Sequence, residues 1–175
     1  MLKKKFFFTD QNIDRNDPIQ LNLLYEQSKK AILSGQHFCN IEDACMLAAL
    51  QCQAQFGNND PQKHKAGFLQ IEEFLPSDYI KKKDIEKSIY NEHSKLKGMS
   101  ELNAKFRYVK QCRSLKTYGV TFFQVREKNP KKNQLQTVLL GINREAVVKM
   151  DPATKDVIEY WPLKTLREWG ATETS

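Results

Sequence analysis

Apolar positions recur at helical spacing over the first two thirds of the chain. Asp17 and Pro18 predict a helix start, because a carboxylate cap followed by proline suits the first turn. Residues three or four positions apart then predict its buried face: Leu21, Leu24, Tyr25, Ser28, Ala31 and Ile32. Gly35 is expected to end this helix.

The same spacing predicts further helical segments as far as residue 119. A second helix is expected from Asn40 to Gly57, with Cys45, Ala48, Ala49, Cys52 and Phe56 on its inner face. Residues 63–79 are less regular and predict short helical turns that end at Pro76. A lysine-rich helix is predicted over residues 81–93. A long helix is predicted from Ser100 to Gly119, carrying Leu102, Phe106, Val109, Cys112 and Leu115.

After Gly119 the pattern changes to β-branched and aromatic runs separated by turn residues. Strands are predicted over residues 120–126, 135–142, 145–150 and 157–161, with a fifth beginning at residues 166–170. The segments 129–133 and 151–155 have turn composition. The chain therefore predicts an α+β fold, with a helical bundle at residues 1–116 and an antiparallel β-sheet at residues 117–175.

Composition adds a positive charge and reduced cysteines to this picture. The net charge of +7 favours an anionic partner: a membrane surface, a nucleic acid or an acidic peptide. Cys39, Cys45, Cys52 and Cys112 have neither the CxxC nor the zinc-ligand spacing, so they are expected to be buried free thiols. Neither a signal peptide nor an apolar run of about 20 residues is present, which predicts a cytoplasmic protein.

No catalytic or cofactor motif accompanies these features. His37, His64 and His93 have no metal-ligand spacing, and the chain has no GxSxG, Walker or GxGxxG sequence. Glu72 and Glu73 are adjacent carboxylates, but their position favours a solvated face over acid–base chemistry. We therefore expect no enzyme activity, no cofactor and no metal.

Three segments resemble the talin family. They are KKKFFFTDQNIDRNDPIQLNLLYEQSKKAIL at 3–33, QCQAQFGNNDPQKHKAGFLQIEEFLPSDYIKKK at 51–83 and MSELNAKFRYVKQCRSLKTYGVTFFQVREK at 99–128, and residues 139–171 continue the match. The resemblance implies the second lobe of a FERM domain, a bundle similar to acyl-CoA-binding protein. It also implies the first strands of the third lobe, a phosphotyrosine-binding or pleckstrin-homology-like sheet, here truncated.

The resemblance also implies a peripheral adaptor that joins adhesion receptors to actin at the cytoplasmic face of the plasma membrane. The second lobe is expected to bind anionic, phosphoinositide-containing membranes through Lys65, Lys81 and Lys83, and Lys63 and Lys82 could add to this patch. The third lobe has further basic residues on the side expected to face the membrane or the membrane-proximal integrin helix: Arg126, Lys128, Lys131 and Lys132. A KKK run taken alone is more often only a solvated helix face.

The third lobe is expected to bind the cytoplasmic tail of a β-integrin by strand addition. The implied contacts are Leu135, Arg167, Glu168 and Trp169. Two positions depart from the family pattern, which has a lysine at Gln134 and an arginine at Glu168. Trp161 is expected to pack within the fourth strand. Because later strands of the fold do not follow Ser175, we also expect an incomplete third lobe, prone to domain-swapped dimerisation.

Two other function classes fit parts of the sequence. The positive charge fits a nucleic-acid-binding module, although the basic residues are not interleaved with aromatics in a recognisable motif. The acyl-CoA-binding-like bundle fits a lipid carrier, a reading that rests on fold analogy. Steep salt dependence with DNA or RNA would indicate the first, and uptake of a labelled acyl chain the second.

Overall fold

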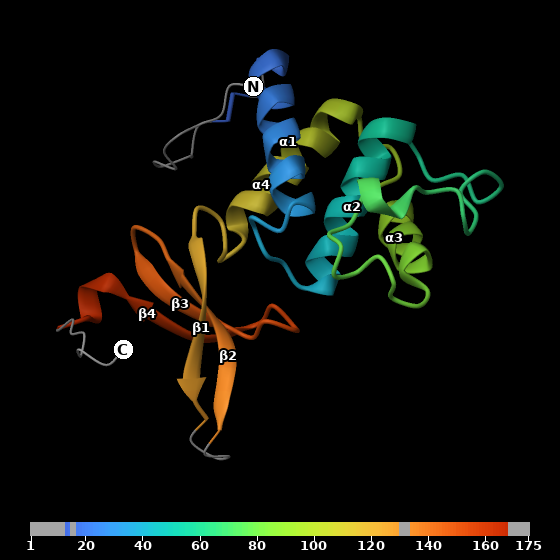
Figure 1. The fold of residues 1–175 in the computed structure, drawn as a ribbon. Helices are drawn as coiled ribbons and strands as arrows, with labels where there is room; N and C mark the ends of the chain where they lie inside the picture. The colour runs from blue at the N-terminus through green and yellow to red at the C-terminus, as the bar shows by residue number, and fades with distance from the viewer. Residues whose placement is uncertain (1–12, 15–16, 130–133, 168–175) are drawn as a thin grey trace. The chain divides into compact units, whose positions relative to one another are not determined.

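The computed structural model describes residues 13–14, 17–129 and 134–167. The chain divides into two compact units, Met1–Tyr118 and Gly119–Ser175 (Figure 1). The first is helical and the second is an antiparallel sheet, so the predicted α+β class is confirmed. Across the described residues, no helix is both long enough and apolar enough to cross a bilayer.

The helical unit contains α1 (Pro18–Leu33), α2 (Ile41–Phe56), η1 (Ile71–Glu73), α3 (Ile85–Ser94) and α4 (Glu101–Ser114). Side chains cap the starts of α1, α2 and α4, and the sequence predicted the first of these caps. The Asp17 carboxylate accepts the backbone N–H groups of Ile19 and Gln20, and the Asn40 side chain accepts that of Asp43. Ser100 caps α4 in the same way.

The core of this unit forms around α2, which packs on α3 and α4, while α1 packs on α4. Tyr25 and Tyr108 meet edge to face in this core, with ring centroids 5.1 Å apart. The predicted face of α1 is buried except for Leu24, which is partly buried. All four cysteines are buried free thiols, as predicted, and burial raises the pKa of Cys39 and Cys52 to about 12.

Four local predictions were wrong. The helix predicted at residue 81 begins at Ile85, because Asp84 takes a left-handed conformation with φ of 56° and breaks the run. The last helix ends at Ser114 instead of Gly119, since the extended Leu115 lets the Thr117 hydroxyl reach the Phe38 carbonyl. The remaining two concern burial: Phe56 and Leu102, expected to be inner residues, are exposed.

The second unit is a meander in which β1 (Thr121–Lys128), β2 (Leu135–Ile142), β3 (Ala146–Met150) and β4 (Val157–Pro162) lie in sequence order. Adjacent strands are antiparallel throughout. These strands confirm the predicted ones to within two residues at their ends. A short 3₁₀ helix, η2 (Leu163–Thr165), follows β4. Leu166 and Arg167 are not in a strand, and the rest of the predicted fifth strand lies outside the described residues.

The buried side chains of the sheet belong mainly to β2 and β3. On β3, Ala146, Val148 and Met150 point to one face and are almost fully buried. Gly141 on β2 lies opposite Phe122, where an added Cβ would come within 2.5 Å of the Phe122 ring and of Val120. This glycine therefore permits the close packing of β1 on β2.

Candidate functional site

A loop between α2 and η1 is bound to the first turns of α3. It leaves α2 at Gly57, whose φ of 74° suits a residue without a Cβ. The Glu86 carboxylate accepts the backbone N–H of Gly67 at 2.6 Å and that of Leu69 at 3.0 Å. The Tyr90 hydroxyl donates to the same carboxylate at 2.8 Å. Glu86 thus links the backbone of the loop to α3.

These bonds also set the charge of Glu86. Burial acts to raise the pKa of its carboxyl, but the N–H groups of Gly67 and Leu69 and the Tyr90 hydroxyl outweigh burial. The resulting pKa is lowered, so Glu86 stays ionised near neutral pH. An ionised carboxylate accepts stronger hydrogen bonds than a neutral one, which favours the bound form of the loop.

The lysines predicted to bind membranes lie on the loop bound to α3 and in the turn that precedes this helix. Lys65 is on the bound loop, where its carbonyl lies 3.3 Å from the Tyr90 hydroxyl. Lys81, Lys82 and Lys83 occupy the turn that leads directly into α3. All four are exposed, and none forms an ion pair with another described residue. The structure therefore places Lys65 and the Lys81–Lys83 turn near one helix end.

Lys63 lies on the same loop but, unlike the other four lysines, forms an ion pair within the described part of the chain. Its ammonium group is 3.9 Å from the Asp60 carboxylate, and its side chain is 77% exposed. An exposed pair at this distance contributes little energy. Lys63 therefore remains available to an anionic partner, together with the other four lysines, and we call these five residues the lysine cluster.

Exposed aromatic rings accompany the lysine cluster, and sequence reasoning missed them. Phe56 and Phe68 are each 44% exposed, and their centroids lie 5.3 Å apart. His64 packs against both rings, at 5.9 Å from Phe56 and 5.0 Å from Phe68. The Phe56 prediction failed because position 56 is on the α2 stripe by spacing but lies at the helix end, where the loop only partly covers it.

His64 connects this aromatic group to α3. Its Nδ1 accepts the backbone N–H of Asp60 at 2.9 Å. The ring stacks on Tyr90 at 6.0 Å and lies 5.5 Å from His93. His93 is fully buried, with Nε2 2.8 Å from the Gly57 carbonyl. Burial lowers the pKa of His93, and the neighbouring His64 lowers it further.

In the sheet unit, the predicted residues flank the hairpin between β1 and β2. Arg126 and Lys128 are exposed and, two positions apart, share one face of β1. Leu135 pairs with Lys128 across the hairpin and is 68% exposed, so its side chain is accessible to a partner. Lys131 and Lys132 lie outside the described residues.

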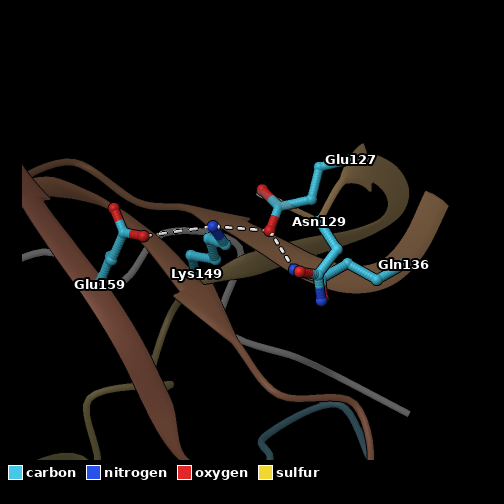
Figure 2. Close-up of polar contacts among 5 residues, drawn as sticks. All are labelled: Glu127, Asn129, Gln136, Lys149 and Glu159. Atoms are coloured by element: carbon cyan, nitrogen blue, oxygen red, sulfur yellow. Dashed lines mark hydrogen bonds and ion pairs between the residues drawn. The ribbon is translucent and has the colours of Figure 1, made fainter. Parts of the chain in front are cut away.

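A polar network crosses the opposite face of this sheet (Figure 2). Lys149 on β3 contacts Glu127 on β1 at 2.7 Å and Glu159 on β4 at 3.2 Å. Gln136 donates to the same Glu127 oxygen, and Asn129 donates to Gln136. The Lys149 and Gln136 bonds lower the pKa of Glu127, and Glu127 raises that of Lys149. The network contains one ammonium group and two carboxylates, so its cation is paired on both sides.

The predicted tail-binding residues beyond β4 are only partly described. Arg167 is exposed, whereas Glu168 and Trp169 lie outside the described residues. Trp161 on β4 is partly buried and pairs with Val147 on β3, consistent with a packing role. Among the described residues, no group of three or more His, Cys, Asp or Glu side chains is arranged to hold a metal ion.

Comparison with protein families identifies both units. The FERM central domain model matches residues 10–123, and the PTB domain (IRS-1 type) model matches residues 123–175. Similar proteins include a talin from Oscarella pearsei at 53% identity, talin-B from Dictyostelium discoideum at 52% and talin-1 from Gallus gallus at 50%. Each match covers all of this chain but only 7% of the talin, so the chain spans a small part of these relatives.

Solved structures with a similar fold are FERM domains. The human myosin 7b MyTH4-FERM domain, solved with the harmonin-a PDZ3 domain, superimposes with a TM-score of 0.60 at 29% identity. The match covers 92% of this chain and 34% of the myosin 7b chain. The FERM domain of Drosophila Merlin superimposes with a TM-score of 0.57 at 22% identity. The match covers 89% of this chain and 52% of the Merlin chain, and at this identity it supports the fold alone.

Proposed function

The chain belongs to the FERM central domain family and is homologous to talins over its whole length, and we propose that it binds anionic, phosphoinositide-containing membranes as part of a non-enzymatic cytoskeletal adaptor. The observation that carries the proposal is the lysine cluster around the start of α3. Lys65 is on a loop that Glu86 and Tyr90 bind to this helix, and Lys81 and Lys83 lie in the turn before it.

The chemistry of the cluster suits a lipid surface. Each ammonium group near an anionic leaflet contributes about 1 kcal/mol, so five lysines supply roughly 5 kcal/mol before ordering costs. That alone gives weak binding. Phe56 and Phe68 add partly exposed apolar surface beside these charges, and apolar area transferred from water gives about 25 cal/mol per Å². Charge and apolar contact together suit an anionic membrane surface.

Charge reversal tests this site. The Lys65→Glu, Lys81→Glu, Lys83→Glu variant is expected to lose most co-sedimentation with vesicles that contain phosphatidylinositol bisphosphate. The matched control is Lys30→Glu, Lys97→Glu, Lys110→Glu, which reverses three exposed lysines outside the cluster and changes the net charge equally. Equal loss in both variants would show that only overall charge matters, and binding retained by the first would refute the site.

For the sheet unit, we propose binding of a β-integrin cytoplasmic tail by strand addition, supported by the match to a PTB domain model. Leu135, Arg167, Glu168 and Trp169 are the proposed contacts, and Arg126, Lys128, Lys131 and Lys132 the proposed basic surface toward the membrane. Leu135→Ala is expected to weaken tail-peptide binding several-fold without changing stability, because the side chain is 68% exposed. Unchanged peptide affinity by calorimetry would remove Leu135 from the site.

The wider role extends the same proposal. The remainder of the protein would link this segment to actin at the cytoplasmic face of the plasma membrane.

The carboxylate at Glu168 is proposed to reduce the affinity of the sheet unit for an acidic tail peptide, and Glu168→Arg would then increase this affinity. A lower affinity in that variant would contradict this role.

A further inference from the structure

The last strand of the meander, β4, has exposed side chains along its outer backbone edge. Among the described residues, β4 pairs only with β3. A strand at the edge of a sheet turns part of its N–H and C=O groups outward, where another chain can pair with them. Ile158 and Tyr160 are about half exposed, and so is the side chain of Glu159 between them. β4 therefore offers both backbone groups and side chains to a further strand.

The exposed side chains of β4 alternate between apolar and acidic. Residues two positions apart share one face of a strand, so Ile158 and Tyr160 lie on one face and Glu159 on the other. Glu159 shares its face with Lys149, its partner across the β3–β4 ladder. A strand added along β4 would therefore meet apolar groups on one face of the sheet and a carboxylate on the other.

The charge of Glu159 is only partly balanced. Lys149 contacts Glu127 at 2.7 Å and Glu159 at 3.2 Å, so one ammonium group serves two carboxylates (Figure 2). Glu127 has the shorter contact and also accepts a hydrogen bond from Gln136. A cation directly opposite Glu159 on an added strand would have its Cβ about 5 Å away, close enough to pair with this carboxylate.

The other edge of the sheet and a second copy of the chain fit a basic strand less well. β1 carries the exposed Arg126 and Lys128, which would repel the cation of such a strand. Two copies of β4 paired antiparallel about Glu159 would set two carboxylates directly opposite each other, and like charges in that position destabilise a sheet. Charge complementarity therefore selects a basic segment at β4.

We propose that the β4 edge binds an extended segment with apolar–basic–apolar alternation by strand addition. Its lysine or arginine lies opposite Glu159, and its apolar side chains lie beside Ile158 and Tyr160. Pro162 ends the ladder available to the segment, because proline has no N–H to donate. This surface goes beyond the proposed integrin contacts, which begin at Leu135 in the hairpin and at Arg167 after η2, and it takes a segment opposite in charge to an acidic tail.

The experiment titrates the full chain with a synthetic peptide that has valine–lysine–valine at its centre, and follows backbone amides by NMR. Residues 157–161 are expected to shift and to exchange more slowly, because new hydrogen bonds protect their N–H groups. Glu159→Gln should weaken binding of this peptide about two- to fivefold, the range for one exposed ion pair. Lys149 keeps its contact with Glu127 in this variant, which preserves the link across the sheet. A peptide with norleucine in place of lysine is the matched control and should bind both proteins equally.

Four results would overturn the proposal. Shifts confined to β1 would place the peptide on the opposite edge. Equal affinity of the lysine peptide for the wild type and Glu159→Gln would remove the ion pair on which the specificity depends. Broadening of β4 signals that grows with protein concentration, without peptide, would assign the edge to a second copy. No shift in β4 at millimolar peptide would exclude strand addition there. None of these results depends on Leu135 or on the lysine cluster, so the proposed functions are tested separately.

Discussion

The helical and sheet units hold their exposed basic residues by different means. In the helical unit, Lys65 lies on a loop whose position depends on the Glu86 side chain and on bonds between residues 17 to 25 positions apart. In the sheet unit, Arg126 and Lys128 lie on β1, whose position is set by backbone pairing with β2. A single side-chain change can therefore displace the first group of cations, whereas the second should tolerate it.

The largest expected effect is in the core of the helical unit, with an exposed ring of the sheet unit as its control. Tyr108→Ala removes a ring that is 1% exposed and packs on Tyr25, and should cost roughly 3–5 kcal/mol of unfolding free energy. Phe123→Ala on β1 removes a ring that is 52% exposed and should cost about 0.5 kcal/mol. Urea unfolding followed by residue-resolved NMR measures each unit. Similar losses in the two variants would contradict the core assigned to the helices.

The second-largest effect is expected from removing the carboxylate that binds the loop between α2 and η1 to α3. Glu86→Ala should cost about 1–3 kcal/mol, because the carboxylate accepts two backbone N–H groups and a hydroxyl. Amide exchange at Gly67 and Leu69 should become faster. Glu72→Ala, an exposed carboxylate on η1, is the control and should leave exchange unchanged. Unchanged exchange in Glu86→Ala would mean that the loop is held by other contacts.

Acid should destabilise the helical unit more than the sheet unit. Burial lowers the pKa of His37 and of His93 below the ordinary value of 6.5. The unfolded chain takes up these protons near pH 6.5 and the folded chain only at lower pH, so stability is full above about pH 6.5 and falls below it. Urea midpoints at pH 7.5 and 5.5 test this. The fall in the urea midpoint from pH 7.5 to pH 5.5 should be smaller in His93→Gln than in the wild type. An equal fall in both proteins would exclude His93 as its source.

The smallest expected effect is in the polar network of the sheet. Lys149→Met keeps the aliphatic stem but removes the contacts to Glu127 and Glu159, and should cost about 1 kcal/mol or less. The hairpin residues should keep their register, because the β1–β2 ladder does not include this side chain. Backbone chemical shifts of β1 and β2 report the register. A change of register would show that side chains position this hairpin after all.

The sequence predicted elements with clear end signals better than those without them. α1 and α2 were located because Asp17 and Asn40 cap their starts and Gly57 follows α2. The start of α3 was missed because the run at Lys81–Lys83 has helical composition, while the left-handed Asp84 that interrupts it has no local signal. The end of α4 was missed because it depends on a bond from Thr117 to a residue 79 positions away.

The candidate site follows the same rule. The lysines of the cluster were predicted from resemblance to talins and from a visible charge run. Their anchors, Glu86 and Tyr90, and the ring of His64 were not, since each acts through contacts between distant positions. A glutamate on a predicted lysine-rich helix looks like an ordinary solvated residue. Only the folded loop shows that it holds the backbone beside the cations.

The central claim, that the helical unit carries the membrane site, is tested most directly by hydrogen–deuterium exchange with and without phosphoinositide vesicles. The account predicts vesicle-dependent protection of residues 60–69 and 80–85, around the start of α3. Protection confined to β1 and β2, with no change in those two segments, would contradict it and place membrane contact on the sheet unit.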